Sequence, residues 1–136
     1  MGTWGTGPFD NDAAADWGYG LANGGLHHIL ATLINVADSG DFLDADEAAE
    51  AVAAAEAVAR LRGGAWNESV YSEAVDQWVG QQTGDVPADL SAMAARAVRR
   101  VLAPGSELLD LWEETGGSDT DHWKRTLDDL VGRLDI

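Results

Sequence analysis

Four side chains near the start of the chain carry oxygen atoms at a spacing that suits either cation binding or helix capping. They lie in the stretch GTWGTGPFDNDAAADW, residues 2–17, and are Asp10, Asn11, Asp12 and Asp16. Hard cations such as Ca²⁺ take six or more oxygen ligands, which carboxylates and side-chain amides supply. Asp and Asn are also favoured where a helix begins, because their oxygens accept hydrogen bonds from free backbone N–H groups. Both kinds of chemistry are therefore open to this segment.

The known calcium-loop pattern does not fit these residues. Ala14 stands at the fifth position, where the loop needs an oxygen, and Ala15 stands where it needs a glycine. We therefore favour a helix start capped by Asp10, Asn11 or Asp12, and we expect no cofactor. A metal site with Asp10, Asp12 and Asp16 as ligands is the alternative.

An extended arm precedes the acidic cluster. Gly5 and Gly7 give the backbone freedom, and Pro8 fixes its own φ and favours extended geometry in the residue before it. Trp4 and Phe9 are large apolar side chains within this arm, and such side chains are normally buried. We expect both to pack on the body of the protein.

The opening motif resembles that of bacterial proteins grouped as domain-of-unknown-function family 4259. The resemblance continues more weakly through residues 49–64, 87–102, 105–114 and 122–134. It implies a free-standing helical bacterial domain, and it implies no activity. The signature residues that it implies are Trp4, Gly5, Gly7, Phe9, Asp10, Asn11, Asp12 and Asp16. One departure from the family is that Gly18 and Gly20 interrupt a segment that is usually a firmer helix.

Charge is the strongest property of the whole chain. Its 136 residues contain 24 acids and 8 bases, a formal net charge of −16, and no cysteine. Such a field repels nucleic acid and anionic lipid, so we expect neither a nucleic-acid nor a membrane partner. A basic protein is the partner that this charge favours. Without a long apolar run or a signal-like start, the chain is expected to be cytoplasmic.

The remaining sequence predicts an all-α fold, an irregular bundle of about six or seven helices in a single domain, 1–136. Residues 1–11 are expected to form the extended arm, packed on that bundle. Hydrophobic spacing, glycine breaks and capping residues, among them Asp44 and Ser106, define the helices. After a short first helix and a break at 23–25, we expect helices over 26–37, 45–62, 69–82, 88–102 and 106–116, and a last one that starts at Asp119 or Thr120.

Two details of these helices can be tested against a structure. The spacing in the second predicts a core stripe of Leu26, Ile29, Leu30, Leu33, Ile34 and Ala37. Glu56 and Arg60 have the i, i+4 spacing of a helical ion pair.

Several polar or aromatic residues have an ordinary structural interpretation that we prefer to a functional one. We expect surface positions for His27, His28 and His122 rather than ligand or base roles. Arg96, Arg99 and Arg100 are expected to pair with carboxylates rather than to form an anion pocket. Of the tryptophans, Trp78, Trp112 and Trp123 fit core faces, whereas Trp4, Trp17 and Trp66 are the ones that could line a groove.

Two classes of function follow from these observations. The first is a non-enzymatic protein-interaction module, for example an inhibitor or immunity-type protein that meets a basic partner through acidic faces. The alternative is a metal- or small-ligand-binding protein or enzyme, centred on the FDND segment at 9–12. The absence of a known catalytic motif favours the first.

Overall fold

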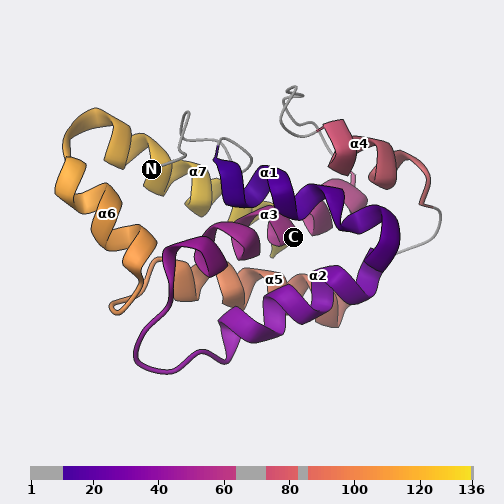
Figure 1. Cartoon of the computed structure of the whole chain (residues 1–136), viewed down its shortest axis with the longest axis horizontal. Coiled ribbons are helices and arrows are strands. Elements are labelled where there is room, and N and C mark those ends of the chain that lie inside the picture. Colours follow the sequence, from indigo (N-terminus) through magenta and orange to yellow (C-terminus); the bar gives the residue numbers. More distant parts are fainter. Residues whose placement is uncertain (1–10, 64–72, 83–85, 136) are drawn as a thin grey trace.

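The computed structural model describes residues 11–63, 73–82 and 86–135, and seven helices account for most of them (Figure 1). They are α1 (Asp12–Tyr19), α2 (Leu21–Ala37), α3 (Ala45–Leu61), α4 (Glu73–Gly80), α5 (Ala88–Val101), α6 (Glu107–Thr115) and α7 (Gly117–Leu134). The described ranges contain no strand, and a parallel bridge joins Leu43 to Ser106. The prediction of an all-α bundle is confirmed.

Helix α3 lies in the middle of the bundle, and the other six helices contact it (Figure 1). Every residue from Ala51 to Arg60 is buried, and six of these ten are alanines. Alanine favours the helix and has a small side chain, so neighbouring helices can approach the α3 backbone closely on several sides. Asp44 begins the helix as predicted, because its side chain accepts hydrogen bonds from the N–H groups of Asp46 and Glu47.

The predicted break at 23–25 is a kink inside α2. Gly25 has φ 54° and ψ −136°, so the helix bends there and continues to Ala37. A residue with a Cβ atom is strained at this positive φ, which explains the glycine.

The predicted core stripe of α2 is wrong for half of its six members. Ile29 and Leu33 are fully buried, but Leu26 is 50 % exposed and Leu30 and Ile34 are each 40 % exposed. The apolar arc of this helix is wider than the strip that α3 and α5 cover, so one edge of the arc faces solvent.

The loop between α2 and α3 is fixed to the start of α6. Leu43 donates its N–H to the carbonyl of Gly105, and Glu107 donates its N–H to the carbonyl of Leu43. Gly105 has φ 89°, and a Cβ atom there would lie 2.2 Å from the Asp41 carbonyl oxygen, so the close approach requires glycine. Ser106 caps α6 as predicted, since its hydroxyl accepts from the Leu109 N–H.

The predicted start of α7 is wrong. The helix begins at Gly117, after a turn in which Gly116 and Gly117 both have positive φ, and no side chain caps it. Thr120 lies inside the helix, where its buried hydroxyl donates to the Trp112 carbonyl of α6. This bond and the stacked rings of Trp112 and Trp123 hold the two helices together.

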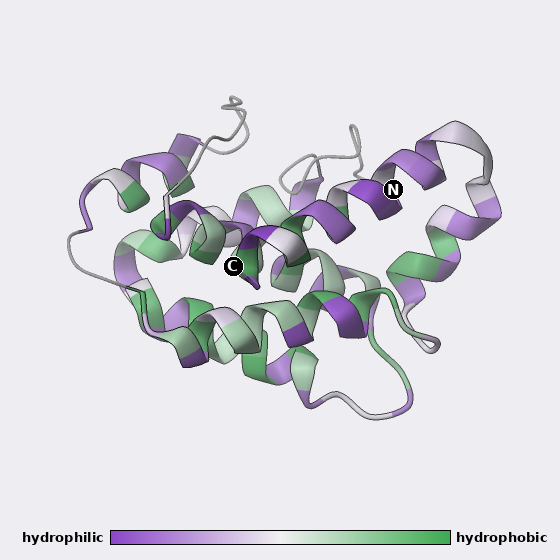
Figure 2. Ribbon diagram, turned by 180° about the vertical axis from the view of Figure 1, so that it is seen from behind, coloured by the Kyte–Doolittle hydropathy of each residue, from purple (hydrophilic) through white to green (hydrophobic). Residues whose placement is uncertain are grey.

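Hydropathy follows this packing. Figure 2 shows most of the α7 ribbon in the colour of hydrophilic residues. The buried side chains of this helix are mainly apolar: Trp123, Leu127, Leu130 and Leu134. None of the described helices is both long and apolar enough to cross a bilayer.

Candidate functional site

The described residues of the acidic cluster lie at the N-terminal end of α1. Asn11 is the N-cap, and its Oδ1 accepts a hydrogen bond from the Ala14 N–H at 2.8 Å, which confirms capping by one of the predicted residues. Asp12 and Asp16 are both exposed. Five further signature residues lie outside the described ranges: Trp4, Gly5, Gly7, Phe9 and Asp10.

A cation site at this position would need more ligands than the described residues bring together. Asp12 and Asp16 join no group of three or more His, Cys, Asp or Glu side chains that could hold a metal ion, within the described part of the chain. The metal hypothesis therefore depends on Asp10, which lies outside the described ranges.

The junction of α1 and α2 is held by an aromatic pair. The rings of Trp17 and His28 stack with centroids 4.6 Å apart, and His28 Nε2 lies 3.0 Å from the Trp17 carbonyl oxygen. Trp17 Nε1 donates to Thr32 Oγ1, which donates to the His28 carbonyl. Trp17 is only 4 % exposed, so it belongs to the core. It does not line a groove, which was the role that its sequence position allowed. His28 is half-buried and structural, whereas His27 is exposed as predicted.

Glu50 of α3 is half-buried at the acidic start of that helix. Burial raises the pKa of its carboxyl, and the neighbouring carboxylates of Asp46 and Glu47 raise it further. Attraction to His28 opposes these effects. Glu50 is therefore a group whose ionisation costs the folded state free energy.

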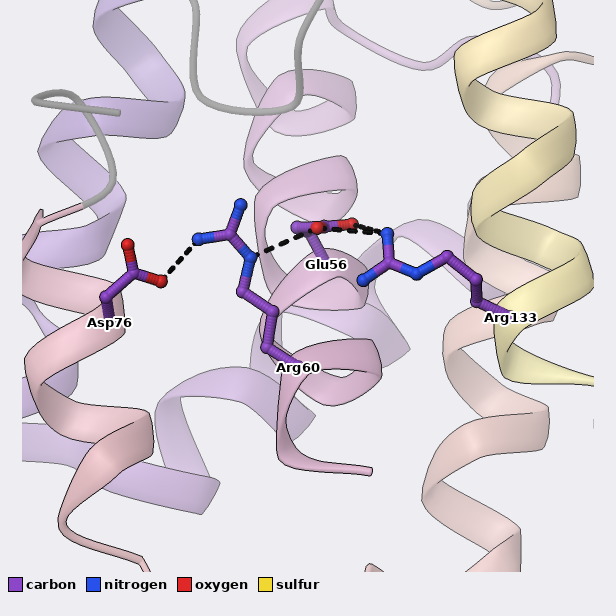
Figure 3. A network of polar contacts seen from close by, with 4 residues as sticks. All are labelled: Glu56, Arg60, Asp76 and Arg133. Atoms are coloured by element: carbon purple, nitrogen blue, oxygen red, sulfur yellow. Dashed lines mark hydrogen bonds and ion pairs between the residues drawn. The ribbon is translucent and has the colours of Figure 1, made fainter. Parts of the chain in front are cut away.

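A buried network of charges joins three helices (Figure 3). Glu56 accepts hydrogen bonds from Arg60 Nε at 3.1 Å and from Arg133 Nη1 at 2.8 and 3.0 Å. Arg60 also pairs with Asp76 of α4. The predicted Glu56–Arg60 pair is confirmed, but no local pattern predicts Asp76 or Arg133 beside it.

Among the described residues the charges of this network balance, and the centre of the network is shielded from water. The side chains of Arg60 and Glu56 are 4 % and 3 % exposed, whereas that of Arg133 is 33 % exposed. Two carboxylates and two guanidinium groups therefore neutralise one another across α3, α4 and α7. Arg133 Nη2 is buried without a hydrogen-bond partner. Since the network joins three helices, its clearest role is to fix their packing.

A cleft of about 510 Å³ lies between the α1–α2 junction and α4. Polar side chains of α4 and the residues after it form one wall, and those that face the cleft include Glu73, Gln77, Gln81 and Gln82. Trp78 and the exposed Tyr19 add aromatic surface. Gln82 Nε2 donates to the Trp78 carbonyl, so this side-chain amide is already hydrogen-bonded to the backbone of α4.

The arginines of α5 are largely occupied. Arg96 pairs with Asp38 at 3.4 Å and Arg99 pairs with Asp135, as expected of surface ion pairs. Arg100 donates to the carbonyls of Gly40 and Pro104, so it ties down backbone instead of meeting a carboxylate. His122 is exposed, as predicted.

The two C-terminal helices form an acidic surface. Residues 107–135 contain nine carboxylates against Lys124, Arg125 and Arg133. Arg133 points to Glu56, and Lys124 lies 4.0 Å from Glu113. Among the described ion pairs, none involves six exposed carboxylates of this region: Asp110, Glu114, Asp119, Asp121, Asp128 and Asp129.

Comparison with known proteins identifies the family. Residues 2–126 match the family described as Domain of unknown function (DUF4259). The match includes the whole opening motif and six of the seven described helices in full. No curated protein and no solved structure matches the chain.

Proposed function

The chain belongs to the domain-of-unknown-function family 4259, and we propose that it is a non-enzymatic interaction module that binds a basic protein. The acidic surface of α6 and α7 supports this proposal more than any other observation. Its six exposed carboxylates outside the ion pairs remain hydrated in the free protein and are available to a partner's lysines and arginines. An inhibitor or immunity-type role in the bacterial cytoplasm is the form of this function that we favour.

The charge of the whole chain makes such an encounter fast as well as specific. A formal charge of −16 attracts a basic protein over long range and repels acidic competitors. Rim carboxylates of this kind mainly raise the association rate, and their effect weakens as salt screens it. Binding of the proposed partner should therefore become slower and weaker when the salt concentration rises.

Two charge-neutralised variants test the proposal. Asp121→Asn/Asp128→Asn/Asp129→Asn removes three carboxylates from α7, and the control Asp16→Asn/Asp41→Asn/Asp89→Asn removes three exposed carboxylates elsewhere. Tagged wild-type chain is crosslinked in cells of its own source, and the captured proteins are identified and repurified for binding measurements. We expect a basic protein that binds the wild type and the control, but binds the α7 variant at least about tenfold more weakly.

Equal binding by both variants would mean that the charge acts without a defined surface, and the proposal would fail. The alternative, a metal or small-ligand site at Asp10, Asn11, Asp12 and Asp16, is tested separately by Ca²⁺ and Mn²⁺ titration. A ligand that binds only the native state stabilises it by RT ln(1 + L/Kd) at a free ligand concentration L, so the melting temperature keeps rising with that concentration. A rise that Asp16→Asn abolishes would favour that alternative.

A further inference from the structure

The cleft between α4 and the α1–α2 junction has a closely packed base. Figure 1 shows α4 beside the bend that joins α1 to α2, and α4 contacts both helices. Val75 and Trp78 of α4 are 1 % and 9 % exposed, so they anchor this helix. A Cβ atom on Gly18 would lie 3.0 Å from Val75 Cγ2, so glycine at this buried position lets α4 come close to α1. Gly18 and Trp78 both line the cleft, and the packing beneath it therefore sets the distance between its walls.

One wall of the cleft is a row of side chains that accept hydrogen bonds. Glu73, Gln77 and Gln81 follow one another at intervals of four residues, which places them on one side of α4 and of the turn after it. All three are exposed, and Gln77 Nε2 donates to Glu73 Oε1 at 3.5 Å. Of the ion pairs in the described part of the chain, none involves Glu73. This row therefore presents a carboxylate and two amide groups to the cleft.

The opposite wall is aromatic and small. Tyr19 lines the cleft from the end of α1 and is 71 % exposed, and Ala22 lines it from the first turn of α2. No lysine, arginine or histidine is among the described residues that line the cleft. An anion would meet the Glu73 carboxylate there, and the net charge of −16 would repel it as well. The cleft therefore favours a cation.

Among organic cations, guanidinium has the shape that these two walls require. It is flat, and its N–H groups point outward in one plane. Its edge pairs with a carboxylate through two parallel hydrogen bonds, and its face stacks on an aromatic ring. Glu73 can take the edge, Tyr19 the face, and the side-chain carbonyls of Gln77 and Gln81 the remaining N–H groups. An ammonium ion has no flat face and is more strongly hydrated.

We propose that this cleft binds a guanidinium group. Its volume of about 510 Å³ lies within the range of roughly 300–1,000 Å³ that small-molecule sites occupy. The group belongs either to a small free guanidine or to an arginine of another protein, and both sources offer the same contacts. The cleft is formed by α1, α2 and α4, whereas the acidic surface lies on α6 and α7. Guanidinium binding therefore does not depend on the proposed basic partner.

An NMR titration with two cations of equal charge tests the preference. Propylguanidine is the side chain of arginine, and butylamine carries an ammonium group in place of the guanidinium. In about 0.15 M NaCl, which screens unspecific attraction, we expect propylguanidine to bind with a dissociation constant on the order of 1 mM, and butylamine at least about fivefold more weakly. Backbone amide signals of residues 18–22 and 73–82 should shift. Equal binding of the two cations, or shifts centred on α6 and α7, overturns the proposal.

Two glutamine variants with the same loss of charge locate the contact. Glu73→Gln removes the bidentate partner and should weaken propylguanidine binding at least about tenfold. The control Glu114→Gln, at an exposed position of α6, should change it less than about twofold. Tyr19→Leu keeps an apolar side chain but removes the ring, and should weaken binding about two- to fivefold. Circular dichroism confirms that the variants are folded, and equal binding by the two glutamine variants overturns the proposal.

A capped arginine, Nα-acetylarginine amide, distinguishes the two sources at the same charge. It adds to propylguanidine the backbone that an arginine has within a protein. Tighter binding than that of propylguanidine supports an arginine side chain of a protein as the ligand, because the backbone then adds contacts. Equal or weaker binding supports a small free guanidine. If neither probe binds below about 20 mM, the cleft is no guanidinium site and the proposal fails.

Discussion

Replacing Glu56 by glutamine should cost the protein a large part of its stability, although the two side chains are nearly the same size. The Glu56 carboxylate is 3 % exposed and accepts hydrogen bonds from Arg60 and Arg133. Glutamine leaves both guanidinium groups facing a neutral amide. Removing one member of a buried ion pair costs about 3–5 kcal/mol.

The structure places the expected loss at the lower end of that range. Arg133 is 33 % exposed and can turn its charge toward water, while Arg60 keeps its contact with Asp76. We therefore expect Glu56→Gln to lower the free energy of unfolding by about 3 kcal/mol, against a typical total of about 5–15 kcal/mol. Arg133→Met leaves Glu56 paired with Arg60 and should cost only about 1.5–2 kcal/mol.

Urea unfolding followed by tryptophan fluorescence measures these losses, provided that the slope with denaturant stays constant. The matched control is Glu114→Gln, the same substitution at an exposed position, which should change stability by less than about 0.5 kcal/mol. If Glu56→Gln is no more costly than Glu114→Gln, the network does not hold the helices together. Equal losses in Glu56→Gln and Arg133→Met would refute the assignment of Glu56 as the centre of the network.

Four further changes test other parts of the structure. The pKa of Glu50 is raised, so the folded state binds its proton more tightly than the unfolded chain does, and stability falls as the pH rises through the folded-state pKa. Glu50→Gln should therefore raise the melting temperature at pH 7, and this gain should disappear below the usual range of a glutamate pKa. Gly105→Ala should cost at least about 2 kcal/mol in urea unfolding, since a left-handed residue alone costs roughly 1–2 kcal/mol and the new methyl group meets the Asp41 carbonyl, whereas Gly132→Ala in an open part of α7 should add about 0.5–1 kcal/mol. Asn11→Ala removes the cap of α1 and should cost about 1 kcal/mol, so a loss near zero would contradict capping. Deleting residues 1–9 removes Trp4 and Phe9, whose burial would contribute on the order of 3–6 kcal/mol, and an unchanged melting temperature would show that the arm adds no stability.

Local rules in the sequence were enough to predict most helix limits. Asp44 and Ser106 cap the helices that they were expected to begin, because an acceptor side chain satisfies free N–H groups wherever a helix starts. Periodicity alone could not predict which part of a wide apolar arc is covered. Leu26, Leu30 and Ile34 belong to the arc of α2, but the positions of α3 and α5 decide what is buried.

Long-range contacts explain the other differences. Arg133 lies 77 positions from Glu56, and no sequence rule connects residues at that separation. Thr120 resembled a cap, yet the turn at Gly116 and Gly117 starts α7 earlier and sends the Thr120 hydroxyl to the Trp112 carbonyl. Trp17 is in the core because the kink at Gly25 brings His28 onto its ring, which a window of sequence does not reveal.

The alanine-built centre of the molecule has a consequence for how the fold opens and how it can vary. Alanine has no side-chain rotamers to freeze, so ordering the middle of α3 costs backbone entropy alone. With neighbours on several sides, its amides should be the last to exchange with deuterium, while those of α4 exchange sooner. The same close approach leaves no space for a larger residue, because added methylene groups would push whole helices apart. Substitutions that accumulate in such a chain are therefore expected on the outer helices, with residues 51–59 changing least.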